Sequence, residues 1–178
     1  MKRPFAAALL ATILFALATP WALRPWFLAV DDFPHEVSVA SSMVDADLYL
    51  NVWILAWLAH AVVHAPSHLF DGNVYYPAPD VIVGSENMFA HLPVTVPVLA
   101  ATGSALAVLK AMVLESFALS GLAMFAFVYH RTRDATAALV AGAAYAFTPA
   151  RVGTIPQPQY LGTQYLPLAL LGVDLVVE

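Results

Sequence analysis

The sequence predicts an all-α integral membrane protein with about four membrane-spanning helices and a long first outer loop. Of its 178 residues, 61% are hydrophobic and 11% are charged, whereas soluble domains have roughly 45–50% apolar and about 25% charged residues. The apolar residues fall in long runs that suit a bilayer. Between Arg24 and Lys110 there is no lysine or arginine, which is typical of a segment outside the cytoplasm.

The composition also bears on partners. The formal net charge is −5 and the seven lysines and arginines do not cluster, so nucleic acid is not expected as a partner. The chain has no cysteine, which removes disulfides and thiolate chemistry. The expected surrounding is the lipid bilayer.

The first predicted span covers residues 5–28. Lys2 and Arg3 precede this apolar run, so a secretory signal peptide is the alternative interpretation. The run is about 24 residues long, which exceeds the core of a signal and suits the roughly 20 residues that cross a bilayer. We therefore expect an uncleaved first span with its N-terminus in the cytoplasm.

Three further spans are predicted over residues 105–129, 135–149 and 160–178. Small residues fill the second of these segments, and they permit close packing of helices in a membrane. Arg131 and Arg133 precede it and favour a cytoplasmic turn there. The last segment stops inside an apolar run. We therefore expect a piece of a longer multi-pass protein of the inner (cytoplasmic) membrane.

The predicted outer loop, residues 31–104, is rich in acidic and polar residues. Within it, residues 48–65 have helical periodicity and carry two tryptophans, which favours a helix lying in the membrane interface. Residues 92–102 are apolar but too few to span, and we expect them to form an interfacial or re-entrant piece.

Four charged residues are candidates for chemistry. Asp45 and Asp47 precede the helix expected over 48–65, where helix capping is the commoner role for either one alone. A carboxylate at the membrane surface is also suited to act as a general base for a lipid-borne substrate. The same two roles compete at Glu86. Arg151 is a lone outer cation that either holds a phosphate as a fork or pairs with a carboxylate, and the sequence does not separate these.

A set of three histidines and one tyrosine each have a structural and a functional interpretation. His60, His64 and His68 are spaced by four and share a helix face, yet Pro66 is expected to break the helix before His68, and no HExxH motif accompanies them. We favour the interpretation that these histidines are polar residues on the water-facing side of an interfacial helix, and not a metal site. Tyr76 offers an aromatic edge for stacking on a sugar, or an interfacial anchor.

Several segments together resemble a known family. The stretches DLYLNVWILAWLAHAVVHAPSHLFDGNVYYPAP, SENMFAHLP, FALSGLAMFAFVYHRTRDATAALVAGAAYAFTPARVG and PQYLGTQYLPLALL occur in this order. The chain from about Asp45 to Leu171 is similar to the N-terminal part of bacterial polytopic membrane proteins of the GT-C glycosyltransferase superfold, in the branch labelled glycosyltransferase-like. The order of these weak motifs carries the resemblance, and none is diagnostic alone.

The resemblance implies transfer of a sugar from a polyprenyl-phosphate-linked donor at the extracytoplasmic membrane face. Asp47 matches the acidic position before L-x-N and is implied as the base, with Asp45 and Glu86 as further catalytic carboxylates. The implied substrate-binding residues are Arg151, Asn51, Tyr76 and Gln159. Ala46 departs from the glycine that is common in relatives. No cofactor is certain, although the three carboxylates suit magnesium or manganese.

The resemblance also implies further helices and a soluble domain beyond this sequence, so the piece alone is not expected to be active. Two rival functions remain. A transporter or flippase for a lipid-linked precursor would need charges near the middle of its spans. A non-catalytic polytopic protein with the same fold is the other, because fold does not fix function.

Overall fold

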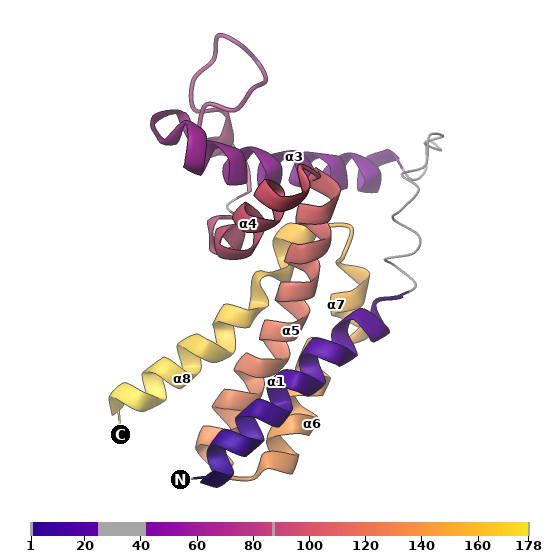
Figure 1. The fold of residues 1–178 in the computed structure, drawn as a ribbon, viewed down its shortest axis with the longest axis vertical. Coiled ribbons are helices and arrows are strands. Elements are labelled where there is room, and N and C mark those ends of the chain that lie inside the picture. Colours follow the sequence, from indigo (N-terminus) through magenta and orange to yellow (C-terminus); the bar gives the residue numbers. More distant parts are fainter. Residues whose placement is uncertain (1, 25–41, 87, 178) are drawn as a thin grey trace. The chain divides into compact units, whose positions relative to one another are not determined.

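The computed structural model describes residues 2–24, 42–86 and 88–177, and all regular elements in these ranges are helical (Figure 1). The chain divides into two compact units. The first unit contains residues 1–35, 114–155 and 160–178, and the second contains residues 36–113 and 156–159.

The first unit is built from the N- and C-terminal parts of the chain. Its helices are α1 (Lys2–Ala22), most of α5 (Ala105–Thr132), α6 (Ala135–Ala146), α7 (Pro149–Gly153), most of the 3-10 helix η4 (Pro158–Gln164) and α8 (Tyr165–Val177). Asp134 begins α6, since its carboxylate accepts hydrogen bonds from the backbone N–H groups of Thr136 at 2.8 Å and Ala137 at 3.2 Å.

Glycines allow three helices of this unit to pack closely. The ring of Phe15, on α1, lies against Gly121 of α5 and Gly142 of α6. A methyl group at Gly142 would come within 2.6 Å of the carbonyl oxygen of Gly121, and one at Gly121 would come within 2.5 Å of the Phe15 ring. The buried residues that complete this core are Ala11, Phe125 and Ala138. The close packing expected from the small residues of segment 135–149 is therefore present.

The second unit consists of α3 (Ser42–His64), η1 (Pro66–His68), η2 (Val81–Gly84), η3 (Phe89–His91), α4 (Leu92–Thr102) and the start of α5. Two indole N–H groups fasten the loop after α3 to that helix. Trp53 Nε1 donates to Asn73 Oδ1 at 2.6 Å, and Trp57 Nε1 donates to the carbonyl oxygen of Leu69 at 2.9 Å. Gly103 ends α4 in the left-handed conformation, with φ of 63°.

Among the residues that the structure describes, three helical stretches are long and apolar enough to cross a membrane, namely Ala46–His64, Ala105–Thr132 and Pro158–Val177. The second and third correspond to the spans predicted over 105–129 and 160–178. The first falls in the segment expected to lie in the interface, and its length and composition also suit a crossing. A multi-helix membrane architecture is thus supported by three candidate spans.

The other two predicted spans differ from the structure. α6 has 12 residues and is therefore about 18 Å long, much shorter than a hydrocarbon core of about 30 Å. It stops before Thr148 because residues that precede a proline disfavour the helical conformation. α1 ends at Ala22, and residues 25–28 of the predicted first span lie outside the described residues. The count of four spans stays a prediction.

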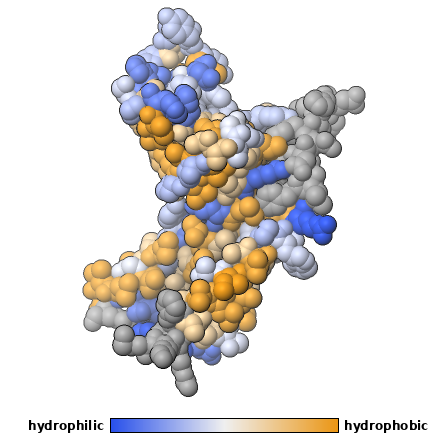
Figure 2. Space-filling view, viewed as in Figure 1, coloured by the Kyte–Doolittle hydropathy of each residue, from blue (hydrophilic) through white to orange (hydrophobic). Residues whose placement is uncertain are grey.

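Large apolar side chains are exposed on the first unit. Figure 2 shows hydrophobic surface over its helices, α1 and α8 among them. The exposed residues on these two helices include Leu9, Leu10, Leu17, Leu166, Val173 and Leu175. A soluble protein rarely exposes so continuous an apolar surface, and such a surface is compatible with a membrane protein.

Candidate functional site

Asp47 lies inside α3 and does not cap it. The helix begins at Ser42, so Asp47 is well past the four free N–H groups of the first turn. The expectation that Asp45 and Asp47 precede the helix is therefore wrong. The reason is that the mixed polar and apolar residues from Ser42 onward form helical turns ahead of the apolar stretch that starts near Leu48. The observed helix ends at His64, before Pro66, and the predicted break ahead of His68 is confirmed.

Asp47 belongs to a cluster of four polar side chains, which we term the Asp47 cluster: Asp47, Asn51, Gln157 and Gln159. Gln157 Nε2 donates to Asp47 Oδ2 at 3.3 Å. Asn51 Nδ2 donates to the carbonyl oxygen of Asp47 at 2.8 Å and to Gln159 Oε1 at 3.0 Å. The structure therefore brings together three of the seven residues that the sequence singled out, Asp47, Asn51 and Gln159.

Burial gives the Asp47 cluster its rigidity. Asn51 is 1% exposed, and both of its amide hydrogens are used, while its Oδ1 has no hydrogen-bond partner among the described residues. Asp47 is half-buried. Its Oδ2 accepts from Gln157, and within the described part of the chain its Oδ1 accepts no hydrogen bond. One carboxylate oxygen is thus oriented by the protein and the other remains available to a ligand.

The short segment 156–159 owes its shape to proline. Pro158 is the first residue of η4, a position where the missing N–H costs nothing. The alternation of proline and glutamine in PQPQ keeps the segment out of a long helix. As a result Gln157 and Gln159 both reach α3. The sequence singled out Gln159 but not Gln157, although both belong to the same alternation.

The structure does not bring the remaining predicted residues of the outer loop into the Asp47 cluster. Tyr76 is 97% exposed. Glu86 is half-buried and shares no hydrogen bond with the cluster. The side chain of Asp45 lies outside the described residues.

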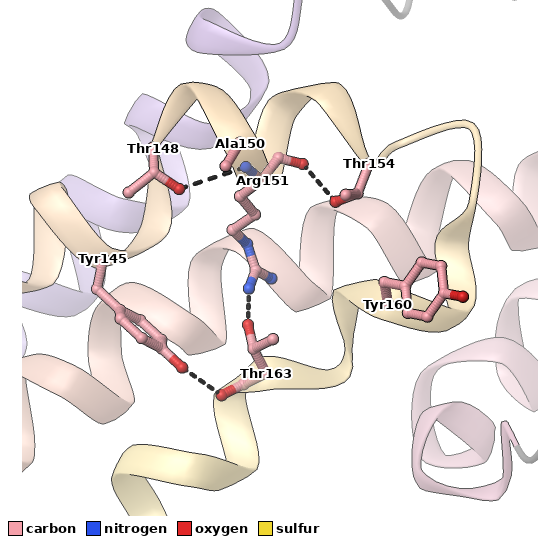
Figure 3. Close-up of a pocket in the computed structure, with 7 residues that line it drawn as sticks. All are labelled: Tyr145, Thr148, Ala150, Arg151, Thr154, Tyr160 and Thr163. Atoms are coloured by element: carbon pink, nitrogen blue, oxygen red, sulfur yellow. Dashed lines mark hydrogen bonds between the residues drawn. The ribbon is translucent and has the colours of Figure 1, made fainter.

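Arg151 lies in the first unit, in a separate pocket shown in Figure 3. Thr148 caps the short helix α7 by accepting a hydrogen bond from the N–H of Arg151 at 3.3 Å. The guanidinium points toward Thr163 (Figure 3), and Nη1 donates to the Thr163 hydroxyl. Nη2 donates to the carbonyl oxygens of Ser116 at 3.0 Å and Leu161 at 2.9 Å.

Among the described residues, an aromatic ring and hydrogen-bond acceptors, and not a carboxylate, surround the charge of Arg151. Arg151 is 7% exposed, and its guanidinium carbon lies 4.8 Å from the centroid of the Phe117 ring, in cation–π geometry. Burial lowers the pKa of Arg151 to about 10, against a small opposing effect of Tyr145, so the side chain is charged at neutral pH. Within the residues that the structure describes, no acidic side chain pairs with it. Of the two interpretations of Arg151, a phosphate ligand or a partner of a carboxylate, the ion pair is absent from this part of the chain.

The pocket beside Arg151 has a volume of about 320 Å³ and is rich in hydroxyl groups. Its lining residues are Tyr145, Thr148, Ala150, Arg151, Thr154, Tyr160 and Thr163. Tyr145 donates from its hydroxyl to the carbonyl oxygen of Thr163 at 2.8 Å. A guanidinium has five N–H donors, and three hydrogen bonds use three of them. The Nε–H and one Nη1–H remain; Nε is buried, so the free Nη1–H is the donor that an anionic oxygen in the pocket could use.

Metal ligands are not gathered in the described side chains. No group of three or more His, Asp or Glu residues among them comes close enough to hold a metal ion. His60 and His64 stack with ring centroids 4.5 Å apart, while His68 contacts Asp71 at 2.7 Å beyond the helix end. Glu86 does not join Asp47, and the side chain of Asp45 is not described. Among the described side chains no such group is gathered, and the magnesium or manganese site stays a prediction from the sequence.

Comparisons of the chain with protein-family models, with curated proteins and with solved structures give no match. The likeness to the GT-C superfold accordingly stays a prediction from the sequence.

Proposed function

We propose that this chain is part of a membrane glycosyltransferase that transfers a sugar from a polyprenyl-phosphate-linked donor to a hydroxyl group at the extracytoplasmic membrane face. One observation carries the proposal. The carboxylate of Asp47 is oriented through one oxygen by Gln157, and its other oxygen accepts no hydrogen bond from the described residues. That is the arrangement a general base needs.

The position of Asp47 along α3 supports chemistry at a membrane surface. Asp47 is the second residue of the apolar stretch Ala46–His64. It stands at the polar end of this stretch whether the helix crosses the bilayer or lies in its interface. A carboxylate there is accessible from water and close to the headgroups of lipid-borne substrates.

The proposed reaction is an inverting displacement. Asp47 Oδ1 takes the proton of the acceptor hydroxyl while the hydroxyl oxygen forms a bond to the anomeric carbon of the donor. The bond from that carbon to the phosphate oxygen breaks, and the polyprenyl phosphate leaves with the electron pair.

We propose separately that the Arg151 pocket of the first unit binds a phosphate group. The support is chemical: the side chain is charged, it has no acidic partner among the described residues, and one Nη1–H is not used by them. Arg151→Lys retains the charge but replaces the planar guanidinium with an ammonium group. It is expected to weaken phosphate binding.

The test is Asp47→Asn, made in the complete open reading frame and assayed in proteoliposomes with a panel of polyprenyl-phosphate sugars. Removing a general base is expected to lower transfer by about 10²–10⁴-fold without loss of folded protein. Asp71→Asn is the matched control, since Asp71 is an acid of the same unit that contacts His68 and the loop. Full transfer by Asp47→Asn removes Asp47 from the mechanism.

A further inference from the structure

The first unit contains an elongated groove that the proposed function does not use. It has a volume of about 520 Å³ and runs between α1, α5 and α8. Its lining is Ala8 and Thr12 from α1, Leu122, Phe125, Ala126, Tyr129 and His130 from α5, Arg133 from the turn after it, and Leu171 and Leu175 from α8.

Polarity changes along this groove. On α5 the lining begins with Leu122, Phe125 and Ala126, which are apolar, and ends with His130; Arg133 follows in the turn after the helix. The positions on α5 follow the spacing of one helix face. From Leu122 to the end of α5 at Thr132 the helix covers about 15 Å, which is close to half of a hydrocarbon core of about 30 Å. The groove therefore has the length and the polarity gradient of one lipid leaflet.

The acidic groups near the polar end are already engaged. Asp174 Oδ2 lies 3.5 Å from Nε of Arg131, and the Asp134 carboxylate caps α6. Arg133 lines the groove and forms no ion pair with any described acidic residue. The guanidinium of Arg133 is therefore not held by an ion pair within the described residues and can contact an anionic group.

We propose that this groove binds a bilayer phospholipid with an anionic headgroup. One acyl chain lies along Leu122, Phe125 and Leu171, and the headgroup phosphate contacts Arg133. Charge complementarity selects anionic over zwitterionic lipids, because a basic residue near a membrane surface attracts anionic lipid. The lipid would fill the space between α5 and α8 beside the Arg131–Asp174 ion pair.

The absence of cysteine makes a direct test simple. Ala126→Cys is labelled with bimane in the full chain, and the protein is reconstituted with dibrominated phosphatidylglycerol or dibrominated phosphatidylcholine. Bromine quenches the label on contact. Half-maximal quenching is expected at a mole fraction of phosphatidylglycerol that is about fivefold lower than that of phosphatidylcholine. Leu171→Cys provides a second label position should Ala126→Cys fold poorly.

Three charge variants decide the outcome. Arg133→Gln is expected to abolish the preference for phosphatidylglycerol and Arg133→Lys to retain it. Arg24→Gln, the same charge change at an exposed residue that does not line the groove, is expected to leave it unchanged. Equal quenching by both lipids, or a preference that survives Arg133→Gln, overturns the proposal. An absence of quenching also overturns it, because protein would then fill the groove. Displacement of the brominated lipid by an isoprenoid phosphate but not by phosphatidylglycerol overturns it as well.

Discussion

The side-chain amide of Asn51 donates a 3.0 Å hydrogen bond to Gln159 Oε1, although 108 positions separate the two residues in the sequence. The same Nδ2 also donates to the carbonyl oxygen of Asp47, one helical turn earlier, at 2.8 Å. One buried amide therefore ties the segment 156–159 to the helix that carries the proposed base. This contact makes the Asp47 cluster a single structural feature within the second unit.

The first prediction concerns that hydrogen bond. In a double-mutant cycle, Asn51→Ala and Gln159→Ala are expected to show a coupling free energy of about 1 kcal/mol, since each single variant already removes the bond. Reversible unfolding in mixed micelles, followed by circular dichroism, measures it. The control pair Asn51→Ala and Thr102→Ala is expected to be additive, because the Thr102 hydroxyl bonds locally: it donates to the Val98 carbonyl oxygen at 2.7 Å and accepts from the Ser104 N–H at 3.2 Å. Additivity in the first pair would mean that the contact contributes nothing.

The second prediction concerns helix packing in the first unit. Gly142→Ala places a methyl group 2.6 Å from the backbone carbonyl oxygen of Gly121, and backbone cannot move away cheaply. The expected destabilisation is about 1–3 kcal/mol. Gly172→Ala is the control, because a methyl group there meets nothing within 4 Å. It is expected to leave stability unchanged or to raise it by up to about 1 kcal/mol. Equal unfolding midpoints for the two variants would contradict the packing described.

The third prediction concerns pH and the loop after α3. The Asp71 carboxylate accepts a hydrogen bond from His68 Nδ1 at 2.7 Å and one from the Asp80 N–H at 3.3 Å, and these hold the pKa of Asp71 below its ordinary value of 3.8. Because the folded pKa is lowered, the stabilising contribution is present above pH 3.8 and is lost as the pH falls through the folded value.

Hydrogen exchange of the Asp80 amide measures this effect once the intrinsic pH dependence of exchange is removed. Protection is expected to decline as the pH falls below 3.8 in the unmodified chain. In Asp71→Asn, which does not titrate, it is expected to stay constant. A decline of the same size in that variant would assign the effect to another group.

The sequence predicted the elements that depend on local chemistry. Long, largely apolar runs indicated the helices now seen as α5 and α8, and Pro66 indicated the end of α3, because hydropathy and proline geometry both act over a few residues. The start of α3 was placed too late, since residues 42–47 mix polar and apolar side chains and include two aspartates, which are typical of a helix cap.

The candidate site was predictable only in part. Asp47, Asn51 and Gln159 were singled out by the resemblance, yet their meeting depends on contacts between distant segments, which no local pattern encodes. Gln157 and Thr163 were missed for the same reason. Arg151 was recognised as a lone cation, but its partners are two carbonyl oxygens, a hydroxyl and an aromatic ring. Carbonyl oxygens occur at every position, so the sequence cannot point to them.

Sidedness is the most direct test of the account, because the proposed chemistry requires the second unit to face the extracytoplasmic space. Tyr76→Cys introduces the sole thiol of the chain at a side chain that is 97% exposed, and Thr132→Cys introduces one next to Arg131 and Arg133. In intact spheroplasts, a membrane-impermeant maleimide is expected to label Tyr76→Cys at once and Thr132→Cys only after permeabilisation. Labelling in the reverse order would contradict the proposed topology and the transferase function with it.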